Sequence, residues 1–209
     1  MEIIPVKYGE SVLPEEMIFK SGSENNFRKI AFKVYLIKTD NKLILVDAGC
    51  ETMPGFEMRD FIGTVQALKN IDITTKEITD VIITHSHHDH IECVKYFTNA
   101  VIHIQKDEYE SGKEYIPDDF KLNLFEDEFL VLGNVKIIKI GGHSKGSCIV
   151  EIKKDGRTYI IAGDECYLRE CLEKKIPTGS SSDKEKSRNF IEKYSDEKYI
   201  VLHLFYNIF

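Results

Sequence analysis

Four of the seven histidines lie in the hexapeptide HSHHDH at 85–90. The short apolar run DVIIT precedes it and predicts a strand that is covered on both faces and ends at this cluster. In an extended segment residues i and i+2 point to the same side, so His85 and His87 can bind one ion together. Once the chain turns, Asp89 and His90 face a neighbouring point. Imidazole and carboxylate suit Zn²⁺, Fe²⁺ or Mn²⁺, so the segment predicts ligands for two ions; a solvated surface run is the alternative.

Further ligand candidates follow or lie in predicted strands. His143 stands in GGHSKGS after the run VKIIKI, Asp164 in IIAGDECY, and His203 in the apolar run IVLHLF. A lone histidine in an apolar strand is more often a core residue, and Asp164 alone could cap a helix. Taken with the hexapeptide, the three supply ligand types that a two-ion site still needs.

Strand and helix patterns alternate along the chain. Two hairpins are predicted, 31–49 and 147–163, the second with Asp155-Gly156 at its turn. Other strands are expected at 101–104, within 129–140 and at 199–205; helices at 58–70, 106–114, 166–175 and 182–195; and a loop at 20–30. The pattern favours the α/β class, an αββα sandwich of two sheets with helices outside, as a single domain over 1–209.

Composition narrows the classes of partner. The net charge of −7 disfavours nucleic acid, and no apolar stretch reaches the ~18–20 residues of a membrane span. The start MEIIPVKYGE lacks the pattern of a secretory signal, and five cysteines without a CxxC pair indicate reduced thiols. We therefore expect a cytoplasmic protein that acts on a small molecule and binds neither nucleic acid nor membrane. The apolar C-terminal LFYNIF is compatible with core packing or with a homodimer interface.

The chain resembles the metallo-β-lactamase superfamily. The family's HxHxDH motif stands at 85–90, and its later His, Asp and His stand, in order, at His143, Asp164 and His203. An early Asp after a strand is also present, as Asp47 in LVDAG. The resemblance covers about residues 31–203 and implies the metallo-β-lactamase fold, with two mixed sheets and two metal ions at the sheet edge.

The resemblance also implies a role for each of these residues. It places His85, His87 and His143 on one ion, Asp89, His90 and His203 on the other, and Asp164 between them. It implies that Asp47 orients ligands, although a turn residue before Gly49 is an equal alternative. The ions are expected to be Zn²⁺, with Fe or Mn as alternatives.

One local feature is similar to the N-acyl-homoserine lactonase branch: Tyr167 stands three residues after Asp164. In that branch this tyrosine contacts the substrate carbonyl and ring oxygen, although packing is the simpler role. His88 stands where an aromatic residue is common in that branch, and this difference leaves the identity of the substrate undecided.

The expected reaction is hydrolysis of a lactone or related ester. A hydroxide shared by both ions would attack the carbonyl, with Tyr167 stabilising the oxyanion and Asp89 passing a proton to the leaving group. Two alternatives remain open: a phosphodiester or thioester hydrolase on the same ions, and a non-catalytic metal-binding or redox-sensing protein.

Overall fold

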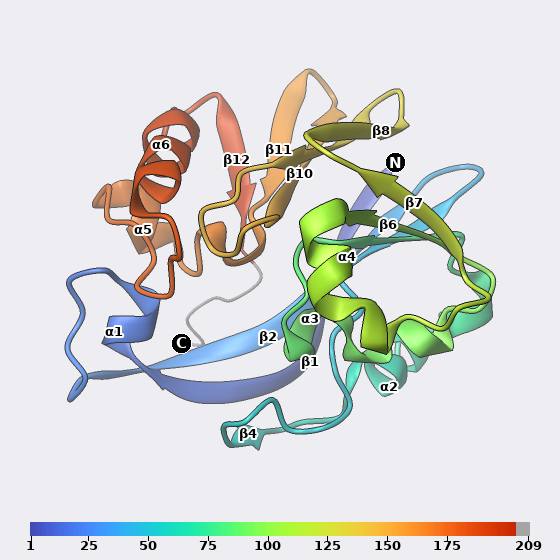
Figure 1. The fold of residues 1–209 in the computed structure, drawn as a ribbon, viewed down its shortest axis with the longest axis horizontal. Helices are drawn as coiled ribbons and strands as arrows, with labels where there is room; N and C mark the ends of the chain where they lie inside the picture. The colour runs from blue at the N-terminus through green and yellow to red at the C-terminus, as the bar shows by residue number, and fades with distance from the viewer. Residues whose placement is uncertain (204–209) are drawn as a thin grey trace. The chain divides into compact units, whose positions relative to one another are not determined.

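The fold is described from a computed structural model, which places residues 1–203 (Figure 1). Contacts divide the chain into two compact units. The first unit comprises 1–11 and 31–125, and the second comprises 12–30 and the chain from 126 onward. The division falls within the first two strands, so each of them contributes residues to both units.

The strands that carry the first unit form a seven-stranded mixed sheet in the order β4-β1-β2-β3-β5-β6-β7. β3, β5, β6 and β7 run parallel, whereas β2 pairs antiparallel with β3, and β1 with β4. β5 is buried along its whole length, as its apolar residues Val81–Ile83 predict, and the buried Asp80 opens it. The bounds are β1 Glu2–Pro14, β2 Phe27–Lys38, β3 Leu43–Val46, β4 Met58–Arg59, β5 Asp80–Ile83, β6 Val101–Gln105 and β7 Lys121–Phe125.

Short helices connect the parallel strands of the first unit. Each parallel connection must cross from the end of one strand to the start of the next, and a helix or helical turn does this here. The α-helices are α2 Thr64–Lys69, α3 His88–Ile91 and α4 Lys106–Gly112, and the 3₁₀ turns are Thr75–Glu77, Glu92–Tyr96 and Lys113–Tyr115.

The second unit contains a five-stranded mixed sheet in the order β12-β11-β10-β9-β8. Its strands pair antiparallel except for β11 and β12, which are parallel. In Figure 1, α5 and α6 lie side by side next to β12. The bounds are β8 Glu128–Leu132, β9 Val135–Lys139, β10 Cys148–Lys154, β11 Arg157–Ile161, β12 Tyr199–Leu202, α1 Glu15–Ile18, α5 Arg169–Glu173, α6 Lys184–Tyr194 and a 3₁₀ turn at Gly163–Glu165.

The predicted hairpins and most predicted strands are confirmed. β2 pairs with β3, β10 pairs with β11 around Asp155-Gly156, and 129–140 holds β8 and β9. α6 begins after Asp183, whose side chain accepts from the amides of Glu185 and Lys186, as an N-cap should. Among residues 1–203, no helix is both long and apolar enough to cross a bilayer.

Several predicted boundaries were wrong, in one case because pairing with a distant strand overrode the local pattern. In the predicted helix 58–70, Met58 and Arg59 pair with β1, and α2 starts only after Gly63 at φ 73°. The predicted loop 20–30 gives way to β2 at Phe27.

The other differences are smaller. Within 166–175 only Arg169–Glu173 is helical, and β12 ends at Leu202, with 204–205 outside the described residues. The sequence analysis also missed β1, whose polar and apolar residues alternate irregularly, and β7, a short and mostly exposed strand at the edge of the sheet.

Candidate functional site

The first unit gathers the histidines of the hexapeptide where β5 ends. His85 is fully buried, and its Nε2 lies 3.0 Å from Nδ1 of the exposed His87. The rings of His85 and His90 are 4.0 Å apart between centroids, and Oδ2 of Asp89 lies 3.6 Å from Nε2 of His90. Two nitrogen ligands of a tetrahedral ion are about 3.3 Å apart, so the spacing of His85 and His87 fits one divalent ion.

Asp47 fixes this cluster through hydrogen bonds to Thr84 and His90. It lies after β3 in the left-handed conformation (φ 62°) and is buried. Its Oδ1 accepts from the amide of Thr84 at 2.7 Å, and its Oδ2 lies 2.9 Å from the Thr84 hydroxyl and 2.8 Å from Nδ1 of His90. A proton held on Nδ1 by the carboxylate leaves Nε2 of His90 as the nitrogen that carries a lone pair, which is the tautomer that a metal needs.

A second buried carboxylate fixes the turn between the histidines. Glu108 on α4 accepts from both the amide and the hydroxyl of Ser86 at 2.8 Å. A Cβ on Gly112 would lie 2.6 Å from Cβ of Ser86, so α4 can approach the turn only with glycine at this position. The packing of α4 against Ser86 therefore fixes the conformation of the turn between His85 and His87.

The second unit brings together two of its three candidate ligands. His143 follows β9 and Asp164 follows β11, and both are buried, with Nε2 of His143 3.5 Å from Oδ2 of Asp164. This spacing is also close to that of two ligands on one ion. Tyr167 is buried beside them, with its ring centroid 6.3 Å from that of His143.

Glu165 organises the backbone around His143. Its Oε1 accepts from the amides of Gly142 and His143, at 3.0 and 3.1 Å, and from the Ser147 hydroxyl at 2.5 Å. Burial raises the pKa of Glu165 to about 7, because the loss of hydration outweighs these hydrogen bonds. The carboxyl group thus fixes the glycine-rich loop that carries His143.

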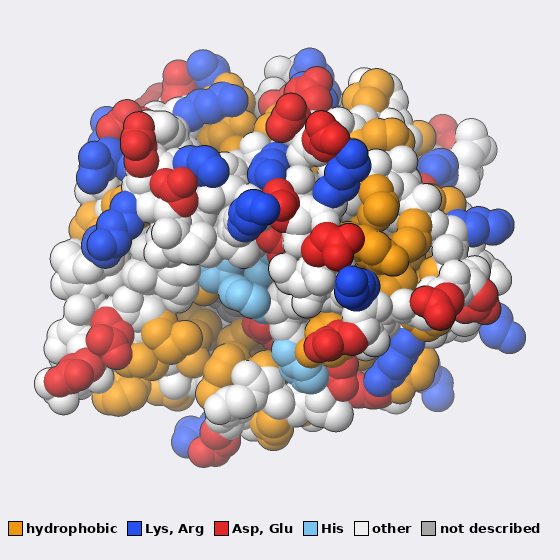
Figure 2. Space-filling model, in the orientation of Figure 1, with side chains coloured by type: hydrophobic (Ala, Val, Ile, Leu, Met, Phe, Trp, Pro, Cys, Tyr) orange, Lys and Arg blue, Asp and Glu red, His pale blue; other side chains and the backbone are white. Residues whose placement is uncertain are grey.

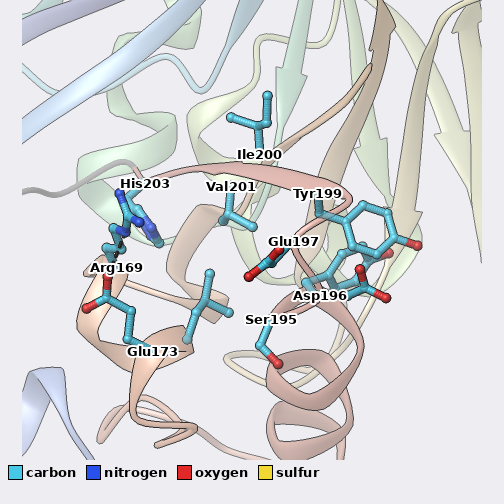
Figure 3. Close-up of a pocket in the computed structure, with 11 residues that line it drawn as sticks. Arg169, Glu173, Ser195, Asp196, Glu197, Tyr199, Ile200, Val201 and His203 are labelled. Carbon is cyan, nitrogen blue, oxygen red and sulfur yellow. Dashed lines mark ion pairs between the residues drawn. The ribbon is translucent and has the colours of Figure 1, made fainter. Parts of the chain in front are cut away.

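His203, the third candidate of the second unit, lies just after β12. Its Nδ1 is 3.1 Å from the carbonyl oxygen of Cys166, which suits an N–H donor at that atom. His203 also forms part of the wall of a cavity of about 460 Å³ between α5, the end of α6 and β12 (Figure 3). On the same wall, Arg169 and Glu173 form an ion pair at 2.8 Å.

The structure thus places the predicted ligands in two clusters, one within each unit. His85, His87, Asp89 and His90 lie together in the first unit, and His143 and Asp164 lie together in the second, with His203 on the same unit's β12 end. Sequence reasoning missed Glu108 and Glu165, because a buried glutamate has no sequence signal that separates it from a surface one. Figure 2 shows acidic and basic side chains interspersed over one face of the molecule.

Comparison with known proteins identifies the family. The model of the metallo-beta-lactamase superfamily matches residues 33–203. An N-acyl homoserine lactonase of Bacillus cereus is 25% identical over 199 residues, which cover 82% of this chain and 78% of the relative.

Solved structures agree in fold. An N-acyl homoserine lactone hydrolase with N-hexanoyl-L-homoserine bound at its catalytic metal centre superposes with a TM-score of 0.83 at 22% identity, over 98% of this chain and 92% of that one. The dizinc quorum-quenching lactonase AidC gives 0.79 at 17% identity, over 98% and 87%. Two mixed sheets, helices and His/Asp ligand clusters match this fold, and the chain therefore belongs to the metallo-β-lactamase superfamily as a metal-dependent hydrolase homologous to the N-acyl homoserine lactonases.

Proposed function

We propose that this protein hydrolyses a lactone or a related ester, with N-acyl-homoserine lactones as the first substrates to test. It would use two divalent ions, held by His85, His87 and His143 and by Asp89, His90 and His203, with Asp164 shared. The observation that carries the proposal is that the superfamily match, which ends at residue 203, includes every one of these ligands.

The donor set fits divalent ions of the zinc type. Each cluster offers imidazole and carboxylate groups, with distances between their ligand atoms close to those between two ligands of one zinc ion. The hydrogen bond from His90 to Asp47 also favours the tautomer of His90 that binds a metal through Nε2. When bound, such ions supply an activated water and polarise a carbonyl oxygen. Zinc is the metal that we propose, because imidazole and carboxylate bind it well at neutral pH.

Two side chains are proposed to handle charge and protons. Tyr167 would donate its hydroxyl proton in a hydrogen bond to the oxygen that becomes negative during attack, and its place beside His143 supports this role. Asp89 would accept the proton of the attacking water and pass it to the leaving alkoxide. The lactonases among the relatives favour a carbonyl substrate over a phosphodiester.

The test is a substrate panel on purified, zinc-loaded protein: a homoserine lactone, a thioester and bis-nitrophenyl phosphate. We expect lactone hydrolysis to dominate, and Tyr167→Phe to lower kcat about 100-fold while both ions remain bound. Tyr159→Phe, on β11 of the same unit, is the matched control and should leave kcat unchanged.

Phosphodiester or thioester hydrolysis in place of lactone hydrolysis would refute the substrate proposal while leaving the two-ion site intact. If Tyr167→Phe behaved like the Tyr159→Phe control, the hydroxyl of Tyr167 would have no part in the reaction.

A further inference from the structure

A second set of ligand-type side chains lies in the first unit, apart from the ligands proposed above. Cys50, His88 and Glu92 each offer one ligand atom, and these atoms all lie within 4.8 Å of one another. Cys50 and Glu92 are buried, whereas His88 is half-buried. Sequence reasoning did not name His88 as a ligand and did not connect the three residues.

We propose that Cys50, His88 and Glu92 bind a further divalent ion, Zn²⁺ by preference. This inference does not depend on the proposed lactone hydrolysis.

The spacing of the nitrogen and oxygen ligands fits a tetrahedral ion. Nε2 of His88 lies 3.4 Å from Oε2 of Glu92 and 2.9 Å from the Thr52 hydroxyl, a hydrogen bond that the ion would replace. Zinc bonds of about 2.0–2.1 Å to nitrogen and oxygen, at tetrahedral angles, place two such atoms about 3.3 Å apart. His88 and Glu92 are four residues apart across α3 and the turn that follows, so their side chains lie on the same side of the chain.

The sulfur is within reach of the same point. With a zinc–sulfur bond of about 2.3 Å, the sulfur would lie about 3.5 Å from the nitrogen, so Cys50 needs to approach by at most about 1.3 Å. Binding of the ion requires this movement of the Cys50 thiol toward the other two ligand atoms. On binding, the thiol proton leaves to solvent as the sulfur–metal bond forms.

The surrounding hydrogen bonds already hold the carboxylate in place. Oε2 of Glu92 accepts from the amides of Glu51 and Thr52 at 2.8 and 3.0 Å, and Oε1 accepts from the Thr52 hydroxyl at 2.8 Å. Lys95 is more distant, with its Nζ 4.0 Å from Oε1. Outer hydrogen bonds of this kind orient metal ligands and raise affinity.

Charge and access also favour a divalent cation. A thiolate and a carboxylate together carry two negative charges, which one Zn²⁺ neutralises. Nδ1 of His88 is 3.3 Å from the Tyr115 hydroxyl, which orients the ring, and the exposed side of His88 gives solvent a route to the fourth ligand position. Three protein ligands and one water form an open zinc site.

The test uses the thiolate as a spectroscopic marker on the full chain. Cobalt(II)-loaded protein should show a near-ultraviolet thiolate-to-cobalt charge-transfer band, which histidine and carboxylate ligands do not produce. Cys50→Ser should lose this band and bind one zinc ion per chain fewer by elemental analysis. Two matched controls, Cys93→Ser and Cys166→Ser, change other buried cysteines and should keep both the band and the ion.

The proposal is overturned if the wild-type protein lacks the band, or if Cys50→Ser retains it. Should Cys50→Ser fail to fold, the variant His88→Ala is tested in its place. The side chain of His88 is only half-buried, so removing it disturbs the core less than a change at the buried Cys50. We expect His88→Ala to weaken cobalt binding, measured by the same band, at least about tenfold. An unchanged affinity in His88→Ala would also overturn the proposal.

Discussion

The two ligand clusters are built in opposite ways. In the first unit all four proposed ligands come from one hexapeptide, whereas in the second the three proposed ligands follow strands that are far apart in the sequence. Asp47 supports the first cluster through the ring of His90 and through Thr84 beside it, and Glu165 supports the second through the backbone amides of residues 142 and 143 and the Ser147 hydroxyl. The local sequence brings the first set of proposed ligands together, whereas the second set depends on loops that the fold brings together.

The largest effects should come from the proposed ligands themselves, one in each cluster. We expect His87→Ala and Asp164→Ala each to lose bound metal and at least about 100-fold in activity, more than the loss of an outer support. Elemental analysis and kcat/KM on the same samples measure both. An ion content in Asp164→Ala equal to that of the wild-type protein would show that Asp164 is not shared.

Asp47→Asn should have the next largest effect. The amide can still accept from the amide of Thr84, but it cannot provide two acceptor oxygens, so it loses the contact with either the Thr84 hydroxyl or Nδ1 of His90. We expect metal affinity to fall about 10–100-fold, measured by competition with a chelator. Unchanged affinity would leave Asp47 as a turn residue only.

Asp80→Asn tests a carboxylate of the first unit that supports the fold instead of the ligands. Burial opposes ionisation of Asp80, but hydrogen bonds from His103, Lys42 and Thr79 outweigh it and lower its pKa from 3.8 to about 2. A lowered pKa stabilises the folded state above pH 3.8, and this contribution is lost as the pH falls toward 2.

We therefore expect Asp80→Asn to lower the free energy of unfolding by roughly 2 kcal/mol at neutral pH, with metal affinity unchanged. Denaturation across the acid range measures this difference, which should shrink as the pH falls. A loss that stayed constant down to pH 2 would contradict the role of the charge.

Glu165→Gln should have the smallest effect. The amide oxygen of glutamine can accept the same three hydrogen bonds as Oε1, so the loop of His143 keeps its position. We expect a change of less than about 1 kcal/mol in thermal unfolding and in metal affinity. Glu165→Ala is the contrasting variant, because it leaves two buried amides unpaired, and it should cost about 1–3 kcal/mol for each. Equal losses in Glu165→Gln and Glu165→Ala would show that the hydrogen bonds accepted by residue 165 do not hold the loop of His143 in place.

Sequence periodicity predicted the elements that depend on neighbouring residues. The hairpin around Asp155-Gly156 and the apolar residues of β5 after Asp80 are recognisable from neighbouring residues alone, and the hexapeptide carries its proposed ligands in one turn. β4 could not be predicted, because Met58 and Arg59 become a strand only through β1, almost 50 residues earlier.

The sequence by itself determined which residue types are available for metal chemistry, and in what order, because ligand identity and short-range spacing are written in the chain. Only the tertiary structure decided which glutamates are buried beside the proposed metal ligands or join them. Glu165, Glu108 and Glu92 each accept backbone amides from residues more than 20 positions away, and a buried carboxylate is stable only where folding brings such donors to it. The meeting of Cys50 with His88 and Glu92 has the same origin, because a long-range contact has no trace in local sequence.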